Sequence, residues 1–212
     1  MKIRKMFFAI AALVPFAAIS AHAQGKFEIT PFAGYETSGS YPITSQTGEI
    51  DQLRLNGSFA FGTFVDYSLT ENFQPEFMWN HNNTSYSAHD ILTSSYFNAF
   101  HSDVDQFQFG GIYMFRSSEV KLRPYAGVSV GFTHEGNNNG NSDRTAFSWS
   151  IGGGVKYYAT RHIGLRADIR YLPTYGSSST QVYCDPFFGC YSANVHNYLN
   201  RGDFVGGIIF KF

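Results

Sequence analysis

Apolar and polar residues alternate with a period of two in eight separate stretches of the chain. In each stretch every second side chain is apolar, and those between are mostly polar or small. Such alternation is typical of β-strands whose two faces have different surroundings, whereas amphipathic helices repeat about every 3.6 residues. The pattern therefore predicts eight strands, over residues 27–36, 58–67, 73–80, 106–115, 123–132, 146–157, 163–171 and 203–212.

The two faces of these strands differ in charge and in side-chain size. The apolar face carries bulky aromatic and aliphatic residues and no Asp, Glu, Lys or Arg, whereas the other face is rich in Gly, Ala and Ser. Small residues suit the interior of a narrow closed barrel, and a water-soluble sandwich would not produce this arrangement. The second face also holds six acidic and five basic residues: Glu28, Glu36, Asp66, Glu76, Asp168, Asp203, Arg123, Lys156, Arg166, Arg170 and Lys211.

Charges inside a barrel are expected to pair, because an isolated buried charge is costly. We expect a network among the inward charges, with Glu76, Arg166, Asp168 and Arg170 as its central members. Such a network either plugs the barrel or forms a proton or ion path. Plugging is favoured, since eight strands leave room mainly for side chains.

A lipid bilayer accounts for the apolar outer face. Lipid offers no hydrogen-bond partners, so a sheet crosses it only as a closed barrel without free edges. The sequence thus predicts an all-β fold, an eight-stranded antiparallel up-and-down transmembrane β-barrel. Aromatic residues near the strand ends fit the girdles of such barrels. They are Tyr67, Phe73, Phe115, Tyr157 and Phe212 at one rim, and Tyr35, Trp79, Phe132 and Tyr171 at the other.

The connections between the predicted strands alternate in length. Long segments alternate with three short ones, near residues 70–72, 116–119 and 159–162. Long surface loops alternating with short periplasmic turns are typical of outer-membrane barrels. An even number of strands puts both ends of the barrel domain on the periplasmic side.

The first residues of the chain have the layout of a secretory signal peptide. Lys2, Arg4 and Lys5 precede an uncharged run over residues 6–19, which is followed by the small-residue pattern of residues 21–23. The apolar run is too short for a spanning helix. We therefore expect a cleaved signal peptide over residues 1–23 and an exported barrel domain over 24–212, with an uncleaved anchor as the alternative.

Composition narrows the function classes further. Of the 212 residues, 18% are aromatic and only 15% are charged, and the formal net charge is −1. An ordinary soluble domain has about 25% charged residues, and a nucleic-acid binder would present a basic face. The two Cys residues form neither a disulfide scaffold nor a four-ligand zinc module by themselves. No cofactor is expected.

Three stretches resemble the small eight-stranded outer-membrane barrels of opacity-protein and outer-membrane-protein-A type: residues 124–131, 165–171 and 207–212. The resemblance implies outer-membrane lipid as the surroundings, periplasmic chaperones as partners and a monomeric barrel. The ending is similar to the signal read by the outer-membrane assembly machinery, with Gly207, Phe210 and Phe212 in register. The first position of this signal is usually polar, but here it is Val205. This fold hosts adhesins, enzymes and plain structural barrels, so it implies no single activity.

The last long connection contains both cysteines. Cys184 and Cys190 are expected to form a disulfide in an oxidising compartment. The ring would either hold Phe187 and Phe188 out towards a partner or staple the loop with these side chains tucked inward. A zinc site made with His196 is a remote alternative.

The favoured function is a structural or surface-interaction (adhesin-like) role carried by four extracellular loops. Candidate contact residues are the loop aromatics Tyr41, Tyr86, Tyr96, Phe97, Phe187, Phe188 and Tyr191. The alternatives are a narrow channel or hydrophobic-solute conduit and, less favoured, a lipid-modifying enzyme. Such an enzyme requires a His base beside a nucleophilic Ser on the strand ends. The sequence nominates no such site, so no enzymatic activity is expected. The loop histidines, which a metal or pH-sensing surface would use, are interpreted as solvated polar residues.

Overall fold

The computed structural model describes residues 26–38, 40–42, 50–90, 95–116, 119–137, 143–175, 180–185, 189–194 and 199–212. The predicted signal peptide over residues 1–23 and the predicted contact residues Phe187 and Phe188 lie outside the described residues. Within the described part, no helix has the length and apolar character needed to span a membrane.

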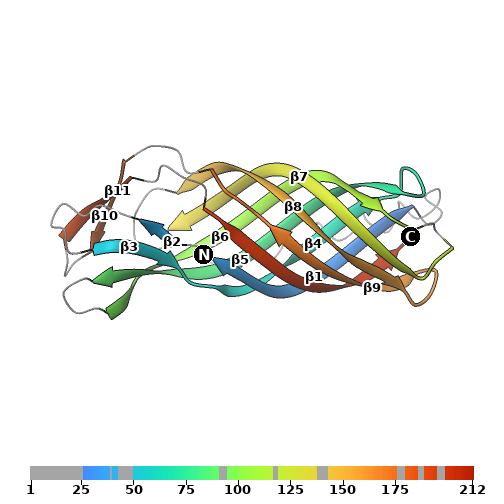
Figure 1. The fold of residues 1–212 in the computed structure, drawn as a ribbon, viewed down its shortest axis with the longest axis horizontal. Coiled ribbons are helices and arrows are strands. Elements are labelled where there is room, and N and C mark those ends of the chain that lie inside the picture. The colour runs from blue at the N-terminus through green and yellow to red at the C-terminus, as the bar shows by residue number, and fades with distance from the viewer. Residues whose placement is uncertain are drawn as a thin grey trace, which may run out of the picture.

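Eight antiparallel strands form a closed barrel (Figure 1). Each strand pairs with its neighbours along the chain, and the first and last strands pair with each other to close the sheet. The barrel strands are β1 (Phe27–Ser38), β4 (Ser58–Tyr67), β5 (Phe73–Asp90), β6 (Ser95–Met114), β7 (Leu122–Asn137), β8 (Arg144–Tyr158), β9 (Ile163–Tyr171) and β12 (Arg201–Lys211). The predicted fold class is confirmed.

Both ends of the described chain lie at the end of the barrel that carries the short turns. The amide of Phe212 donates to the carbonyl of Phe27 at 2.8 Å, which joins the last residue to the start of β1. The connections after β4, β6 and β8, which were predicted to be short, lie at this end. Those after β1, β5, β7 and β9, which were predicted to be long, lie at the opposite end, which we call the long-connection end. The placement of the connections at the two ends of the barrel agrees with the sequence-based expectation, but the alternation of their lengths does not hold throughout, because β5 and β6 are joined by residues 91–94 alone.

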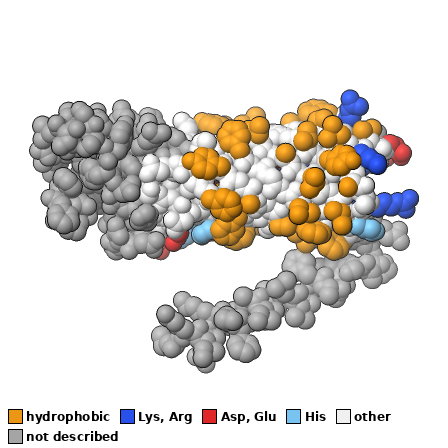
Figure 2. Space-filling model, turned by 90° about the horizontal axis from the view of Figure 1, so that it is seen from below, with side chains coloured by type: hydrophobic (Ala, Val, Ile, Leu, Met, Phe, Trp, Pro, Cys, Tyr) orange, Lys and Arg blue, Asp and Glu red, His pale blue; other side chains and the backbone are white. Residues whose placement is uncertain are grey.

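Side chains alternate between the inside and the outside of the barrel as the sequence pattern predicts. Along β9 the residues alternate regularly between exposed and buried positions. Figure 2 shows apolar side chains over the barrel wall and Lys and Arg side chains at the end with the short turns. Val128 on β7 and Ile151 on β8 lie opposite each other and expose 62% and 51% of their surface.

The strands at the long-connection end extend beyond the predicted limits. The region 82–102 was predicted to be a loop, but β5 and β6 continue as a paired hairpin to Asp90 and from Ser95. Two added strands, β2 (Ser40–Pro42) and β3 (Ile50–Leu55), pair with each other, and β3 pairs with the outer part of β5. A further hairpin consists of β10 (Thr180–Asp185) and β11 (Gly189–Asn194).

The prediction of loops in these regions was therefore wrong. Outside the lipid-facing band, a strand has no apolar face to present, so the alternation that reveals a strand is absent although the backbone ladder continues. We call the part of β5 and β6 over residues 83–103, together with β2 and β3, the outer extension.

Candidate functional site: the barrel interior

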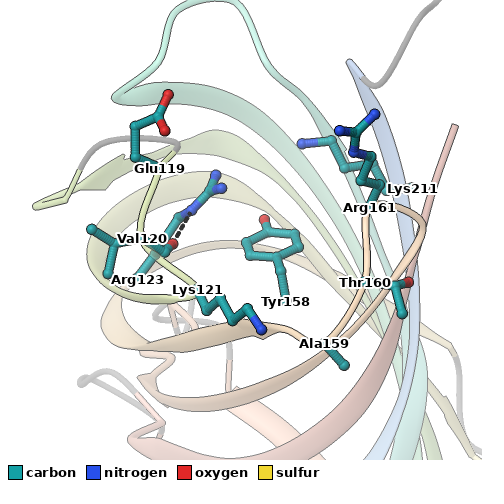
Figure 3. Close-up of a pocket in the computed structure, with 9 residues that line it drawn as sticks. All are labelled: Glu119, Val120, Lys121, Arg123, Tyr158, Ala159, Thr160, Arg161 and Lys211. Atoms are coloured by element: carbon teal, nitrogen blue, oxygen red, sulfur yellow. Dashed lines mark hydrogen bonds between the residues drawn. The ribbon is translucent and has the colours of Figure 1, made fainter.

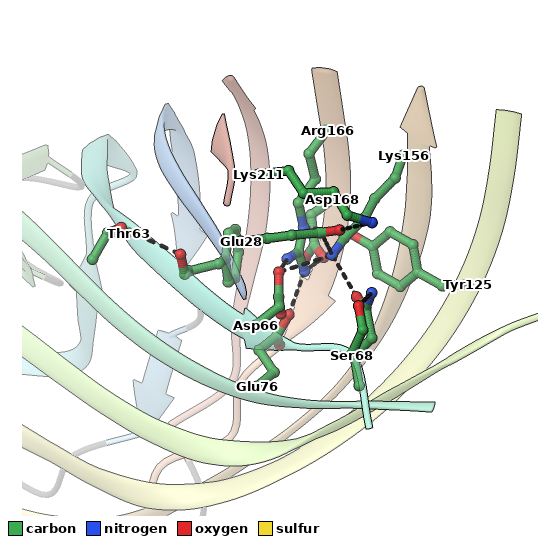
Figure 4. Close-up of polar contacts among 12 residues, drawn as sticks. Glu28, Thr63, Asp66, Ser68, Glu76, Tyr125, Lys156, Arg166, Asp168 and Lys211 are labelled. Carbon is green, nitrogen blue, oxygen red and sulfur yellow. Dashed lines mark hydrogen bonds and ion pairs between the residues drawn. The ribbon is translucent and has the colours of Figure 1, made fainter. Parts of the chain in front are cut away.

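Inward charges from five strands meet in one layer near the short-turn end (Figure 4). The layer is formed by Glu28 on β1, Asp66 on β4, Glu76 on β5, Lys156 on β8, and Arg166, Asp168 and Arg170 on β9. We call these seven residues the ion-pair layer. All of them are buried, and every one faces the interior because it occupies the alternate position to the lipid-facing residues.

Lys156 is enclosed by acceptors. Its ammonium group lies 2.9 Å from Glu28 Oε2 and 2.8 Å from Asp66 Oδ2, and it donates to Gln74 Oε1 at 2.8 Å. The hydroxyl of Tyr158 also donates to Glu28, at 2.9 Å. Each removed hydration partner of Lys156 is thus replaced by a protein oxygen, as a buried cation requires.

The two arginines of β9 share two carboxylates. Arg166 lies 2.6 Å from Glu76 and 2.9 Å from Asp168, and Arg170 lies 2.7 Å from Glu76 and 3.2 Å from Asp168. Arg166 also approaches Asp66 at 3.3 Å, which links this group to Lys156. The structure thus brings together the four residues expected at the centre of the network.

Neutral side chains complete the arrangement around Arg166. The phenol of Tyr125 accepts from Arg166 Nε at 2.8 Å and donates to Asp168, and the guanidinium stacks 3.6 Å above the ring centroid of Phe64. A Cβ at Gly154 would clash with the backbone carbonyl oxygen of Ala167 and would also lie 2.7 Å from the phenol oxygen of Tyr125, so this position has no room for a side chain. The small residues on the inward face therefore accommodate the large side chains that reach across the barrel.

The charges of the network balance. Lys211 on β12 lies 3.3 Å from Glu28, and with it the linked groups comprise four cations and four carboxylates. Balance matters because burying an unpaired charge costs far more than burying a neutral pair. Arg123, also assigned to the network from the sequence, lies at the short-turn end, where its Nε donates to the carbonyl of Val120 at 2.9 Å.

An apolar cluster lies inside the barrel next to the ion-pair layer. It consists of Phe32, Phe64, Met78, Leu172 and Val205, all buried. Phe64 and Met78 each stand two positions farther from the short turns than Asp66 and Glu76 on the same strands. The rings of Phe32 and Phe64 lie 4.5 Å apart between centroids. Two successive side-chain layers, one charged and one apolar, thus fill the barrel interior.

A second polar layer lies on the far side of this cluster, towards the long connections. Asn80 donates to Asp203 at 3.0 Å and Gln106 donates to Glu36 at 3.0 Å. Arg201 lies 2.6 Å from Glu135, an ion pair that the sequence analysis missed. Arg201 stands two residues before Asp203, on the same face of β12, so extending the alternation by one period would have found it.

The apolar band on the outside ends at a polar group near the long-connection end. His81 Nδ1 and Asp105 Oδ1 lie 2.9 Å apart on neighbouring strands, and the indole of Trp79 donates to Asp105 at 3.1 Å. These side chains occupy lipid-facing positions of the alternation. They mark the level where the wall changes from apolar to polar.

The remaining predicted site residues lie at the two ends of the barrel. Gly207, Phe210 and Phe212 belong to the end of the chain, with Phe210 and Phe212 exposed on the outer wall. At the other end, the register of β10 and β11 places Cys184 opposite Cys190. Within the described residues, no group of three or more His, Cys, Asp and Glu is placed to hold a metal ion.

The fold and its contents define the class of protein. A closed antiparallel barrel with an apolar, aromatic-rich wall and an interior of paired charges is a transmembrane β-barrel. The chain belongs to the family described as the outer membrane protein beta-barrel domain, whose model matches residues 9–195. The resemblance to small eight-stranded outer-membrane barrels is therefore confirmed, and outer-membrane lipid surrounds the barrel wall.

Two solved structures illustrate the likeness. The outer membrane protein OprG from Pseudomonas aeruginosa superposes with a TM-score of 0.63 at 16% identity, over 90% of this chain and 97% of that chain. Neisserial surface protein A (NspA) gives a TM-score of 0.57 at 16% identity, over 88% of this chain and 97% of that chain. At such identity the likeness shows the fold alone. No curated protein matches the chain in sequence.

Proposed function

We propose that this barrel acts at the cell surface through its outer extension, as a scaffold for interaction rather than as a channel or an enzyme. The observation that carries the proposal is the filling of the barrel interior. Solute crossing the barrel would have to displace the paired charges of the ion-pair layer and then the apolar cluster beside it. Eight-stranded barrels are narrow enough for side chains alone to fill.

The outer extension is the second feature that supports a role in surface interaction. Beyond the last pairing of β4 with β5, at Ala60 and Asn82, the hairpin of β5 and β6 continues and takes up β3 as a new neighbour. A paired β-structure holds its surface residues in place, as recognition by loops on a rigid scaffold requires. The extension lies at the end of the barrel that outer-membrane proteins of this kind present to the exterior.

The test of this proposal compares whole cells that display the full chain with cells that display a shortened variant. The variant replaces residues 83–103 with an Asn-Gly turn, which suits a two-residue hairpin between Asn82 and Val104. The control replaces only residues 91–94 with the same turn. At equal surface amounts, we expect adhesion to coated extracellular-matrix proteins and polysaccharides to be lost in the first variant and kept in the control.

Conductance across planar bilayers tests the alternative of a narrow channel. We expect the purified barrel to be silent. Reproducible current steps that disappear in a Glu76→Gln variant would contradict the proposal and establish the narrow-channel function instead. Adhesion that is absent in the full chain, or unchanged in the shortened variant, would also contradict it.

We further propose that the signal peptide over residues 1–23 directs export and that Gly207, Phe210 and Phe212 deliver the barrel to the assembly machinery. The pattern of residues 21–23 supports cleavage before Gln24. The intact mass of the protein purified from outer membranes is expected to match a chain that begins at Gln24. A mass that includes the first 23 residues would indicate the uncleaved anchor.

A further inference from the structure

A pocket of about 490 Å³ opens at the short-turn end of the barrel (Figure 3). The turn between β6 and β7 contributes Glu119 and Lys121, the turn between β8 and β9 contributes Arg161, and the strands contribute Arg123, Tyr158 and Lys211. We call it the mouth pocket. It lies at the opposite end from the outer extension, so it is independent of the function proposed above.

The charged residues that line the mouth pocket are mainly cationic. Lys121, Arg123, Arg161 and Lys211 stand against Glu119 as the one carboxylate of the lining. Clustered cations of this kind are unfavourable in an empty site because like charges repel. Their arrangement around a common hollow therefore suits an anion.

Tyr158 organises the inner side of the pocket. The guanidinium of Arg123 lies 4.4 Å from the centroid of its ring, and the ammonium of Lys211 lies 5.3 Å from the same centroid. The phenol donates to Glu28, which fixes the ring in place. Two cations are thus held beside one aromatic ring, an attractive contact for both.

Beneath the pocket, Glu28 compensates only part of the positive charge of the lining. Glu28 lies 3.3 Å from Lys211, but it also pairs with Lys156 at 2.9 Å. The ion-pair layer with Lys211 is already neutral. Lys121 and Arg161 stand outside that balance, with Glu119 as the acidic member of the described lining.

We propose that the mouth pocket binds the phosphate group of a small anion. Guanidinium and ammonium groups both bind phosphate well, the former through paired hydrogen bonds and the latter as a point charge. The volume of about 490 Å³ exceeds that of a phosphate alone, so an organic phosphate fits. Two sources share this chemistry, namely the headgroup of an anionic phospholipid at the membrane rim and a soluble phosphate ester.

The test uses the full protein purified from outer membranes in a nonionic detergent. Its first arm measures binding of glycerol 3-phosphate by calorimetry. Its second arm measures, by native mass spectrometry, retention of phosphatidylglycerol against phosphatidylcholine added in equal amounts. Binding of glycerol 3-phosphate identifies a soluble ester as sufficient, and selective retention of phosphatidylglycerol alone identifies the lipid headgroup.

A matched pair of variants makes the test specific. The variant Lys121→Gln with Arg161→Gln removes two exposed cations of the mouth pocket and leaves the ion-pair layer intact. The control Lys26→Gln with Arg116→Gln removes two exposed cations at the same end, outside the lining. We expect the first variant to weaken binding roughly tenfold or more, because it removes two charged hydrogen-bond donors from the pocket. We expect the control to bind as the wild type does.

Binding should also weaken as salt is raised, because the interaction is between exposed charges. The proposal is overturned if neither ligand binds to the wild-type protein. It is equally overturned if the two variants lose binding to the same extent, because the attraction would then belong to the charge of this end as a whole.

Discussion

The ammonium group of Lys156 depends entirely on protein oxygens, because its side chain is fully buried between Glu28 and Asp66. Replacing it with Met keeps the length of the side chain but leaves both carboxylates without this cation. Breaking a buried pair in this way costs about 3–5 kcal/mol. We expect the Lys156→Met variant to lose that much free energy of unfolding, measured by urea unfolding in detergent or lipid vesicles.

Lys211 provides the control for this prediction. It pairs with the same Glu28, at 3.3 Å, but its side chain is 18% exposed. Water can therefore replace part of the contact that Lys211 makes with the carboxylate. Lys211→Met is therefore expected to cost clearly less than Lys156→Met. Equal losses in the two variants would show that burial does not govern the strength of these pairs.

Val128 and Ile151 test the lipid-facing wall. Either residue replaced by Arg places a charge in the apolar band, at a cost of about 2–4 kcal/mol near the midplane. Thr145 is an outward, exposed residue on the same strand as Ile151, but it lies beside the outer rim, opposite His134. Thr145→Arg should cost about 0–1 kcal/mol at that depth. Folding yields into lipid vesicles report the difference, and wild-type yields for Val128→Arg and Ile151→Arg would contradict the assignment.

At the scale of residues, the sequence predicted which side chains face the barrel interior better than it predicted which of them pair with each other. The period of two identifies Lys156, Asp66 and Arg166 as members of one face without any knowledge of the fold. It says nothing of which strands face each other across the interior, because that depends on the tilt and stagger of the closed barrel. For the same reason the meeting of Phe32 and Phe64 in an apolar layer was not predicted.

At the scale of elements, the strands were predicted where lipid makes their two faces different and missed where it does not. The strand β9 has a lipid-facing residue at every second position and was predicted with its observed limits, Ile163–Tyr171. The outer half of β5 and the strands β2, β3, β10 and β11 have no such constraint. Their pairing depends on backbone hydrogen bonds, which leave little trace in the sequence.

The hairpin of β10 and β11 carries a prediction about the two cysteines. Residues directly opposite in an antiparallel pair lie within the Cα separation that a disulfide tolerates, and Cys184 is opposite Cys190. We expect a disulfide, worth about 2.4 kcal/mol for the loop it closes on the entropy estimate. The protein from outer membranes should resist alkylation until it is reduced.

The effect of this disulfide is expected to stay within the hairpin. β10 and β11 form a sheet of their own, apart from the barrel sheet. A variant with both cysteines replaced by Ser should therefore unfold at the same urea concentration as the wild-type barrel. Alkylation of the unreduced protein at both cysteines would refute the predicted bond.

At the scale of the whole molecule, closure of the barrel depends on the pairing of β1 with β12. Phe212 takes part through its backbone, which bonds to Phe27, and through an exposed ring on the wall. Deleting Phe212 is expected to lower assembly in cells more than refolding in detergent, because refolding needs no delivery signal. Membrane fractions and heat-modifiable gel shifts measure the two yields, and equal losses would leave only the structural contribution of the residue.

The joining of Phe27 to Phe212 has one more consequence. Eight strands that each pair with two neighbours form a ring, and a ring has no beginning. A short peptide between residues 212 and 27 and a cut in one of the other turns would give a chain of different order that encloses the same interior. Circular permutation of this kind is tolerated at exposed loop tips when the chain ends lie close together at the surface. The closed wall therefore does not depend on which of its strands comes first along the chain.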